Sequence, residues 1–118
     1  MILPKEGSLL RIFIGESDKH EGAPLYEWIV KQAKERGLAG TTVLRGIEGF
    51  GAHSRVHTAK ILQLSTDLPV VIEIVDTREN IENFLPVIDG AIPEGLATLE
   101  RVEVRFYRSG ASRANPWR

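Results

Sequence analysis

The chain has 118 residues, of which 15 are Lys or Arg and 16 are Asp or Glu, for a formal net charge of −1. This length fits one domain over residues 1–118, with a core over about 8–108, and the near-neutral charge excludes a global attraction to nucleic acid or to a membrane surface. The lack of cysteine excludes thiol catalysis, disulfides and cysteine-ligated zinc, and favours a cytoplasmic protein.

The first half of the chain predicts a strand, a helix and a second strand. Residues 8–14 are rich in β-branched and aromatic side chains that alternate in the manner of a strand. Pro24 suits a first helical position, and an apolar stripe continues until Gly37, which predicts a helix over about 24–36. Residues 42–47 form a second expected strand.

The second half repeats this order. Residues 68–75 are the most apolar run in the chain and predict a central strand. Asp76 and Glu79 have the spacing of a capping box and predict the start of a second helix, in which Pro86 is expected to kink or end the last turn. A final strand is expected over 99–107. No run approaches the roughly 18 apolar residues of a membrane span, so no membrane insertion is expected.

This order of elements predicts a fold of the α+β class. Two βαβ units with right-handed crossovers give the ferredoxin-like βαββαβ arrangement, a four-stranded antiparallel sheet with both helices on one face. The other face would then be bare, and an apolar bare face needs a partner. We therefore expect a homo-oligomer packed through its sheets. The residues expected on that face are Leu9, Phe13, Val71 and Val75 around Arg11 and Glu73.

A long loop over residues 46–67 separates the two halves. It carries three glycines near its start and the basic residues Arg55 and Lys60. Free backbone N–H groups beside positive charge suit an anion such as a phosphate. The spacing matches neither a P-loop nor a dinucleotide fingerprint, so a tight bend followed by a solvated basic loop is the alternative interpretation.

Two histidines in the loop, His53 and His57, are four residues apart. On a helix they would face the same way, as zinc ligands do, but no carboxylate lies between them and only His20 remains as a third ligand. Ser54 beside His53 is not a nucleophile elbow. We therefore predict no metal site and no catalytic residue.

Several of these segments resemble the PII signal-transduction proteins. The resemblance lies in Thr42-Val43, in Gly49-Phe50-Gly51 and in the strand Leu68–Val75. Over roughly residues 8–110 the chain resembles a PII-related family called domain of unknown function 190. The resemblance implies a ferredoxin-like homotrimer that binds an adenine nucleotide in clefts between subunits, with the long loop contacting an unidentified target protein.

The resemblance also implies a set of nucleotide-binding residues. These are Gly49, Phe50, Gly51, Ala52, His53, Arg55, Gly95 and Arg108. Leu96 stands where the family has a phosphate-binding lysine, Phe106 stands where an arginine is expected, and the family's Gly-Arg-Gln at the loop base is missing. Fewer positive charges should disfavour a triphosphate more than a monophosphate. Arg45, Arg55 and Lys60 are candidates to replace them.

The resulting prediction is a non-enzymatic, cytoplasmic, nucleotide-sensing protein that binds AMP, ADP or ATP and signals through the loop. Two alternatives stay open. One is a small ferredoxin-like enzyme that uses His53 or His57 as general acid or base. The other is a metal-tolerance trimer of the CutA type, which shares the fold. The C-terminal residues 109–118 are expected to be a loose tail.

Overall fold

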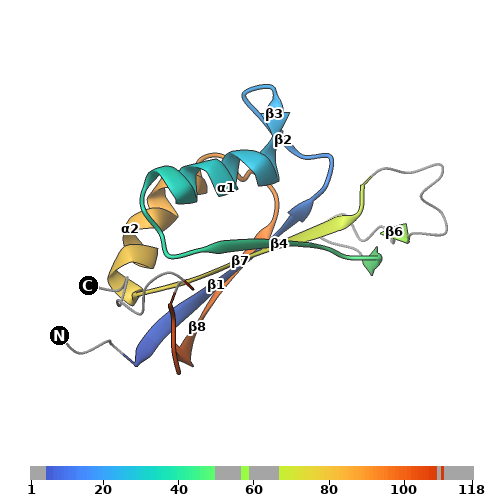
Figure 1. Ribbon diagram of the computed structural model, residues 1–118. Coiled ribbons are helices and arrows are strands. Elements are labelled where there is room, and N and C mark those ends of the chain that lie inside the picture. The colour runs from blue at the N-terminus through green and yellow to red at the C-terminus, as the bar shows by residue number, and fades with distance from the viewer. Residues whose placement is uncertain (1–4, 50–56, 59–66, 109, 111–118) are drawn as a thin grey trace.

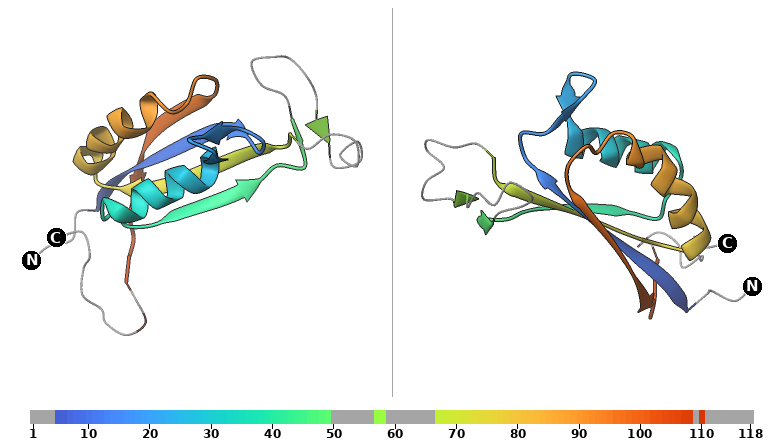
Figure 2. Two further views of the ribbon diagram at one scale, coloured as in Figure 1. Left: turned by 90° about the horizontal axis from the view of Figure 1, so that it is seen from above. Right: turned by 180° about the vertical axis from the view of Figure 1, so that it is seen from behind.

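The computed structural model describes residues 5–49, 57–58, 67–108 and 110. Its main sheet has four antiparallel strands in the order β4-β7-β1-β8, and both helices lie on one face of it (Figures 1 and 2). The main strands are β1 (Glu6–Gly15), β4 (Thr41–Arg45), β7 (Pro69–Asp76) and β8 (Leu96–Glu103), and the helices are α1 (Leu25–Glu35) and α2 (Arg78–Asp89). The predicted α+β, ferredoxin-like arrangement is confirmed.

The core lies between the helices and the covered face of the sheet. Alternate residues of β1 and β7 point into it, because successive side chains of a strand face opposite sides of the sheet. Burying each large aliphatic side chain contributes about 1.5–3 kcal/mol to folding. The buried core residues are Leu10, Ile12, Ile14, Leu25, Ile29, Ala33, Val70, Ile72, Ile74, Ile81, Phe84, Ile88 and Ala91.

The other face of the sheet has no covering layer among the described residues (Figure 1). The four apolar residues predicted there are half-buried within the single chain, as expected for the inner strands of an open face. The edge strands extend the apolar surface, because Leu44 is paired with Val71 and Leu96 with Phe13. These two leucines are 48% and 57% exposed. We call this surface, with Leu9, Phe13, Leu44, Val71, Val75 and Leu96, the open sheet face.

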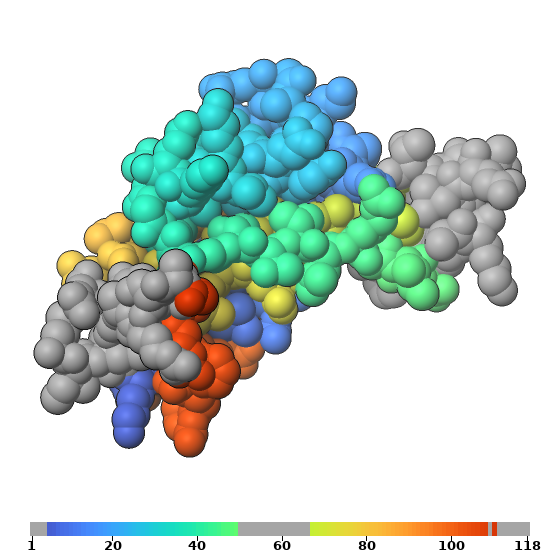
Figure 3. Space-filling view, in the orientation of Figure 1, coloured from blue at the N-terminus to red at the C-terminus, as the bar shows by residue number. Residues whose placement is uncertain are grey.

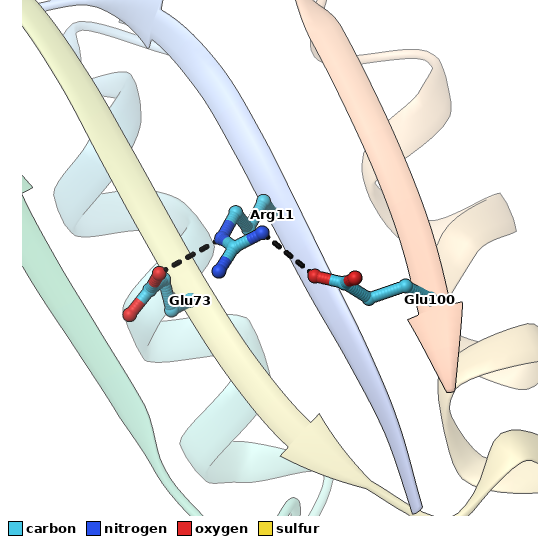
Figure 4. Close-up of polar contacts among 3 residues, drawn as sticks. All are labelled: Arg11, Glu73 and Glu100. Carbon is cyan, nitrogen blue, oxygen red and sulfur yellow. Dashed lines mark hydrogen bonds and ion pairs between the residues drawn. The ribbon is translucent and has the colours of Figure 1, made fainter. Parts of the chain in front are cut away.

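A charged triad lies within the open sheet face (Figure 4). Arg11 Nε lies 3.0 Å from Glu73 Oε2, and Arg11 Nη1 lies 2.7 Å from Glu100 Oε1. The hydrogen bond to Glu73, together with the charges of both carboxylates, raises the pKa of the Arg11 guanidinium above its ordinary value. Arg11 and Glu73, which were both predicted on this face, are therefore paired within one chain. Glu100 completes the triad and was not predicted.

The last strand begins and ends earlier than residues 99–107. It covers Leu96–Glu103 because β1 is its partner, and Glu103 is paired with Glu6 at the start of β1. Val104 N still donates a 2.6 Å hydrogen bond to Lys5 O. The alternation of apolar and charged residues that predicted a strand as far as Tyr107 therefore continues past Glu103, where the pairing with β1 ends.

The start of α2 corrects the predicted capping box. Thr77 is the N-cap, and its hydroxyl accepts a 3.2 Å hydrogen bond from Asn80 N. Asp76 is buried and accepts from Ala39 N at 2.8 Å, Thr77 N at 2.6 Å and Asn80 Nδ2 at 2.8 Å. It therefore ties the start of α2 to the turn before β4. Pro86 does not end the helix early, because α2 continues to Asp89.

Asp76→Ala is expected to lower the free energy of unfolding by about 2–3 kcal/mol, because it leaves buried backbone donors without a partner. Thr77→Ala removes one capping bond and should cost about 1 kcal/mol. Glu79→Ala, which removes the predicted capping partner, should cost little. Urea unfolding at one fixed protein concentration measures all three. An equal loss for Glu79→Ala and Asp76→Ala would favour the capping box instead.

A small hairpin precedes α1. It consists of β2 (Lys19–His20) and β3 (Ala23–Pro24). The His20 ring packs edge-on against Trp28 with ring centroids 4.4 Å apart, and Trp28 also contacts the core. Trp28 therefore packs against its own chain.

Candidate functional site

The long loop leaves the sheet after β4 and returns at β7, at the end of the sheet where β1 also ends (Figure 1). Its described part contains two short paired strands, β5 (Glu48–Gly49) and β6 (His57–Thr58), with Gly49 opposite His57. Backbone pairing therefore joins the start of the loop to its middle.

Two glycines at the start of the loop pack against Pro69. A Cβ atom on Gly46 would lie 2.8 Å from Pro69 Cγ, and one on Gly49 would lie 3.1 Å from the same atom. Gly46 N also donates a 2.7 Å hydrogen bond to Pro69 O. Glycine is therefore required at these two positions by packing against Pro69, whether or not a ligand binds there.

The turn after β1 contacts both stems of the loop. On the β7 side, Ser17 N and Ser17 Oγ donate to Asp67 Oδ1 at 3.2 and 2.8 Å, and Glu16 N donates to Leu68 O at 2.8 Å. On the β4 side, Arg45 Nη2 forms an ion pair with Glu16 Oε2. Sequence reasoning did not assign Glu16, Ser17 or Asp67 to the site. The signal in the sequence that could have identified them is the polar pair Glu16-Ser17, which directly follows Gly15 at the end of β1.

Five of the eight predicted site residues lie outside the described part of the chain. They are Phe50, Gly51, Ala52, His53 and Arg55. The other three are Gly49, Gly95 and Arg108, and they are not brought together in one chain. Gly49 follows the edge strand β4, whereas Gly95 precedes the opposite edge strand β8.

Gly95 lies tightly against the end of β1. A Cβ atom there would be 2.7 Å from the backbone oxygen of Phe13 and 3.2 Å from Ile14 Cγ2. Close packing therefore explains the glycine without a ligand. Gly95 lies at the same end of the sheet as the loop base. The end of β1 is paired there with both neighbours, Phe13 with Leu96 and Gly15 with Pro69.

The described segment after β8, which contains Arg108, lies at the other end of the sheet from the end of β4 (Figure 3). The Arg108 guanidinium stacks over the Phe106 ring at 4.4 Å, and the preceding Tyr107 donates its hydroxyl hydrogen to Ala39 O. The eight-residue strand β8 lies between Gly95 and this segment and is itself about 24 Å long, given a rise of about 3.4 Å per strand residue. A ligand that contacts both Gly95 and Arg108 would therefore need them from different copies of the chain.

A groove of about 540 Å³ lies between the end of α2 and the start of β8. Its lining is mostly apolar, with two carboxylates, and includes Gly95. Carboxylates repel phosphate, so this groove alone does not suit a phosphate group. The lining residues are Glu82, Leu85, Pro86, Ile88, Asp89, Ile92, Gly95, Leu96 and Ala97.

The described residues contain no cluster of three His, Asp or Glu side chains that could hold a metal ion. His53 and the side chain of His57, on which the metal and enzyme alternatives depend, lie outside what the structure describes. None of the helices in the described ranges has the length and apolar character needed to cross a membrane.

Residues 7–104 match the model of the DUF190 family, whose description is "Uncharacterized ACR". A UPF0166 protein of Aquifex aeolicus (strain VF5) is 49% identical over 98 residues, which cover 83% of this chain and 92% of that protein.

Solved structures with low sequence identity show the same fold. CPII, a nitrogen regulatory PII-like protein of Thiomonas intermedia K12 bound to ADP, AMP and bicarbonate, is similar with a TM-score of 0.65 and 16% identity, covering 84% of this chain and 88% of that one. The divalent ion tolerance protein CutA1 of Ehrlichia chaffeensis is similar with a TM-score of 0.53 and 13% identity, covering 86% of this chain and 84% of that one.

Proposed function

We propose that this chain, which belongs to the DUF190 family, is a PII-like regulatory protein that senses an adenine nucleotide. The observation that carries the proposal is the fold shared with CPII, whose structure contains ADP and AMP. The glycine-rich loop base at one end of the sheet is consistent with it. Sensing needs a binding site and a responsive segment, and in this proposal the 46–67 loop is the segment that contacts a target protein.

The proposed site lies between subunits of a homotrimer packed through the open sheet face. Two features support this arrangement. The open sheet face is largely apolar and has no covering layer among the described residues. Arg108 follows β8 and Gly95 precedes it, so the two lie toward opposite ends of that strand. A neighbouring copy would supply the second set of residues.

The phosphates would lie near the backbone of Gly49, Phe50, Gly51, Ala52 and His53, with Gly95 at the cleft and a guanidinium from Arg55 or Arg108. Arg108 is exposed and stacks on Phe106, so its guanidinium is accessible to a ligand bound to a neighbouring copy. The small number of cations at these positions favours a mono- or diphosphate over a triphosphate. The role is binding in the cytoplasm rather than catalysis.

A thermal-shift screen of the full chain with AMP, ADP, ATP and cyclic nucleotides tests the proposal. A ligand at about 100 times its dissociation constant stabilises the folded state by roughly 2.7 kcal/mol, which shifts the melting temperature by several degrees. Arg108→Ala should weaken binding by about 1.5–3 kcal/mol through loss of a charge-assisted hydrogen bond. Glu27→Ala, at an exposed position of α1, is the control and should leave affinity unchanged.

No stabilisation and no calorimetric heat at millimolar nucleotide would remove the sensing hypothesis. Divalent cations belong in the same screen, because the fold is also that of CutA1. A shift with a divalent cation and none with any nucleotide would favour the metal-tolerance alternative.

A further inference from the structure

Arg45 is the arginine at the loop-bearing end of the sheet. Two other arginines of the sheet lie farther from this end: Arg11 is four residues before the end of β1, and Arg101 is paired with Ser8 near the start of β1. Arg36 and Arg78 lie at the end of α1 and the start of α2. The Arg45 side chain is 62% exposed, and its ion-pair partner Glu16 is 22% exposed. The guanidinium of Arg45 therefore lies directly before the 46–67 loop and is paired with the carboxylate of Glu16.

Glu16 is held in this position by the backbone. Glu16 N donates to Leu68 O at 2.8 Å, and the adjacent Ser17 is bound to Asp67 by two hydrogen bonds. The turn is further fixed by Gly15 N, which donates a 2.9 Å hydrogen bond to Asp18 Oδ2. The Glu16 carboxylate thus belongs to a fixed turn that bridges the two stems of the loop.

An anionic ligand can replace such a carboxylate. An exposed ion pair contributes little to stability, so separating Arg45 from Glu16 has a small cost. The guanidinium fork matches phosphate oxygens and binds them in a bidentate manner, and a phosphate carries more negative charge than a carboxylate. A phosphate at Arg45 would at the same time be repelled by the nearby Glu16.

We infer that Arg45 is a phosphate-binding residue of the proposed nucleotide site, and that Glu16 occupies it as an internal competitor in the absence of ligand. The inference rests on the proposed function. Arg45 supplies one of the cations that are missing where Leu96 and Phe106 stand. Because Arg45 directly precedes the loop, exchange of Glu16 for phosphate breaks the ion pair between this stem of the loop and the turn after β1.

Titration calorimetry of the full chain with ADP tests the inference through Glu16→Gln, Arg45→Gln and the double variant. Glu16→Gln should bind ADP about three- to tenfold more tightly, because competition and repulsion are both removed. Arg45→Gln should bind at least about tenfold more weakly. The double variant should gain at most about threefold over Arg45→Gln, since without Arg45 only the direct repulsion by Glu16 is left to remove. Arg45→Lys, which keeps the charge and loses the fork, should give an intermediate loss.

The matched controls are Arg78 and Glu79, two exposed charged residues in the first turn of α2. Arg78→Gln and Glu79→Gln change the net charge in the same way and should leave ADP affinity unchanged. Melting temperatures close to that of the wild type establish that the variants are folded.

The possible outcomes distinguish failure of the role inferred for Arg45 and Glu16 from failure of the proposed nucleotide-sensing function. ADP binding by the wild type with unchanged affinity in both Glu16→Gln and Arg45→Gln would overturn the inference and leave the proposed function in place. Weaker binding by Glu16→Gln would also overturn it, because Glu16 would then support the site. No heat from the wild type or any variant, with AMP, ADP or ATP, would overturn the proposed function and the inference with it.

Discussion

Val71→Arg is expected to dissociate the proposed homotrimer into monomers. Val71 lies on β7 within the open sheet face, next to Phe13 in the β1 ladder and Leu44 in the β4 ladder. A buried charge without a partner costs several kcal/mol, and a cost of about 4 kcal/mol raises a dissociation constant nearly a thousandfold. Sedimentation velocity across a range of protein concentrations would measure the change.

Two controls separate charge from shape. Val71→Leu keeps the surface apolar and should leave most of the assembly intact. Asn83→Arg adds the same charge on an exposed position of α2, on the covered side of the sheet, and should have no effect. A wild-type protein that sediments as a monomer, or a Val71→Arg variant that assembles normally, would contradict the role of the open sheet face.

Gly95→Ala is expected to lower the free energy of unfolding by about 2–3 kcal/mol. The added Cβ would lie 2.7 Å from the Phe13 backbone oxygen and 3.1 Å from Ile92 Cγ2. A backbone oxygen within a sheet cannot move without disturbing the ladder between β1 and β8, so overpacking at this position is costly. Urea unfolding followed by circular dichroism would measure the loss.

Gly40→Ala is the matched control, because a Cβ there would have no atom within 4 Å. It should change stability by less than about 0.5 kcal/mol. If Gly95→Ala unfolds like the wild type but loses nucleotide affinity, Gly95 serves the ligand rather than the packing. Loss of stability without nucleotide would instead establish the packing role.

The sequence alone determined the order of the elements and the two faces of the sheet. Alternation along residues 8–14 and 68–75 separates the core residues from the open sheet face, because side chains alternate across any strand whatever its partners. The stripe of α1 at helical spacing similarly indicates which side packs on the sheet. These patterns are local, and they also predicted that an apolar face would remain uncovered.

Contacts between distant segments were decided only by the tertiary structure. Asp76 seemed to be a local helix cap, but its carboxylate also binds Ala39 N, 37 residues away. The end of β8 follows from pairing with β1, not from its own alternation. At the loop base, Glu16 meets Arg45 because β1 and β4 both end beside β7, and Arg108 lies far from Gly95 because β8 runs between them. Local periodicity carries no information on strand register, so these placements required the assembled sheet.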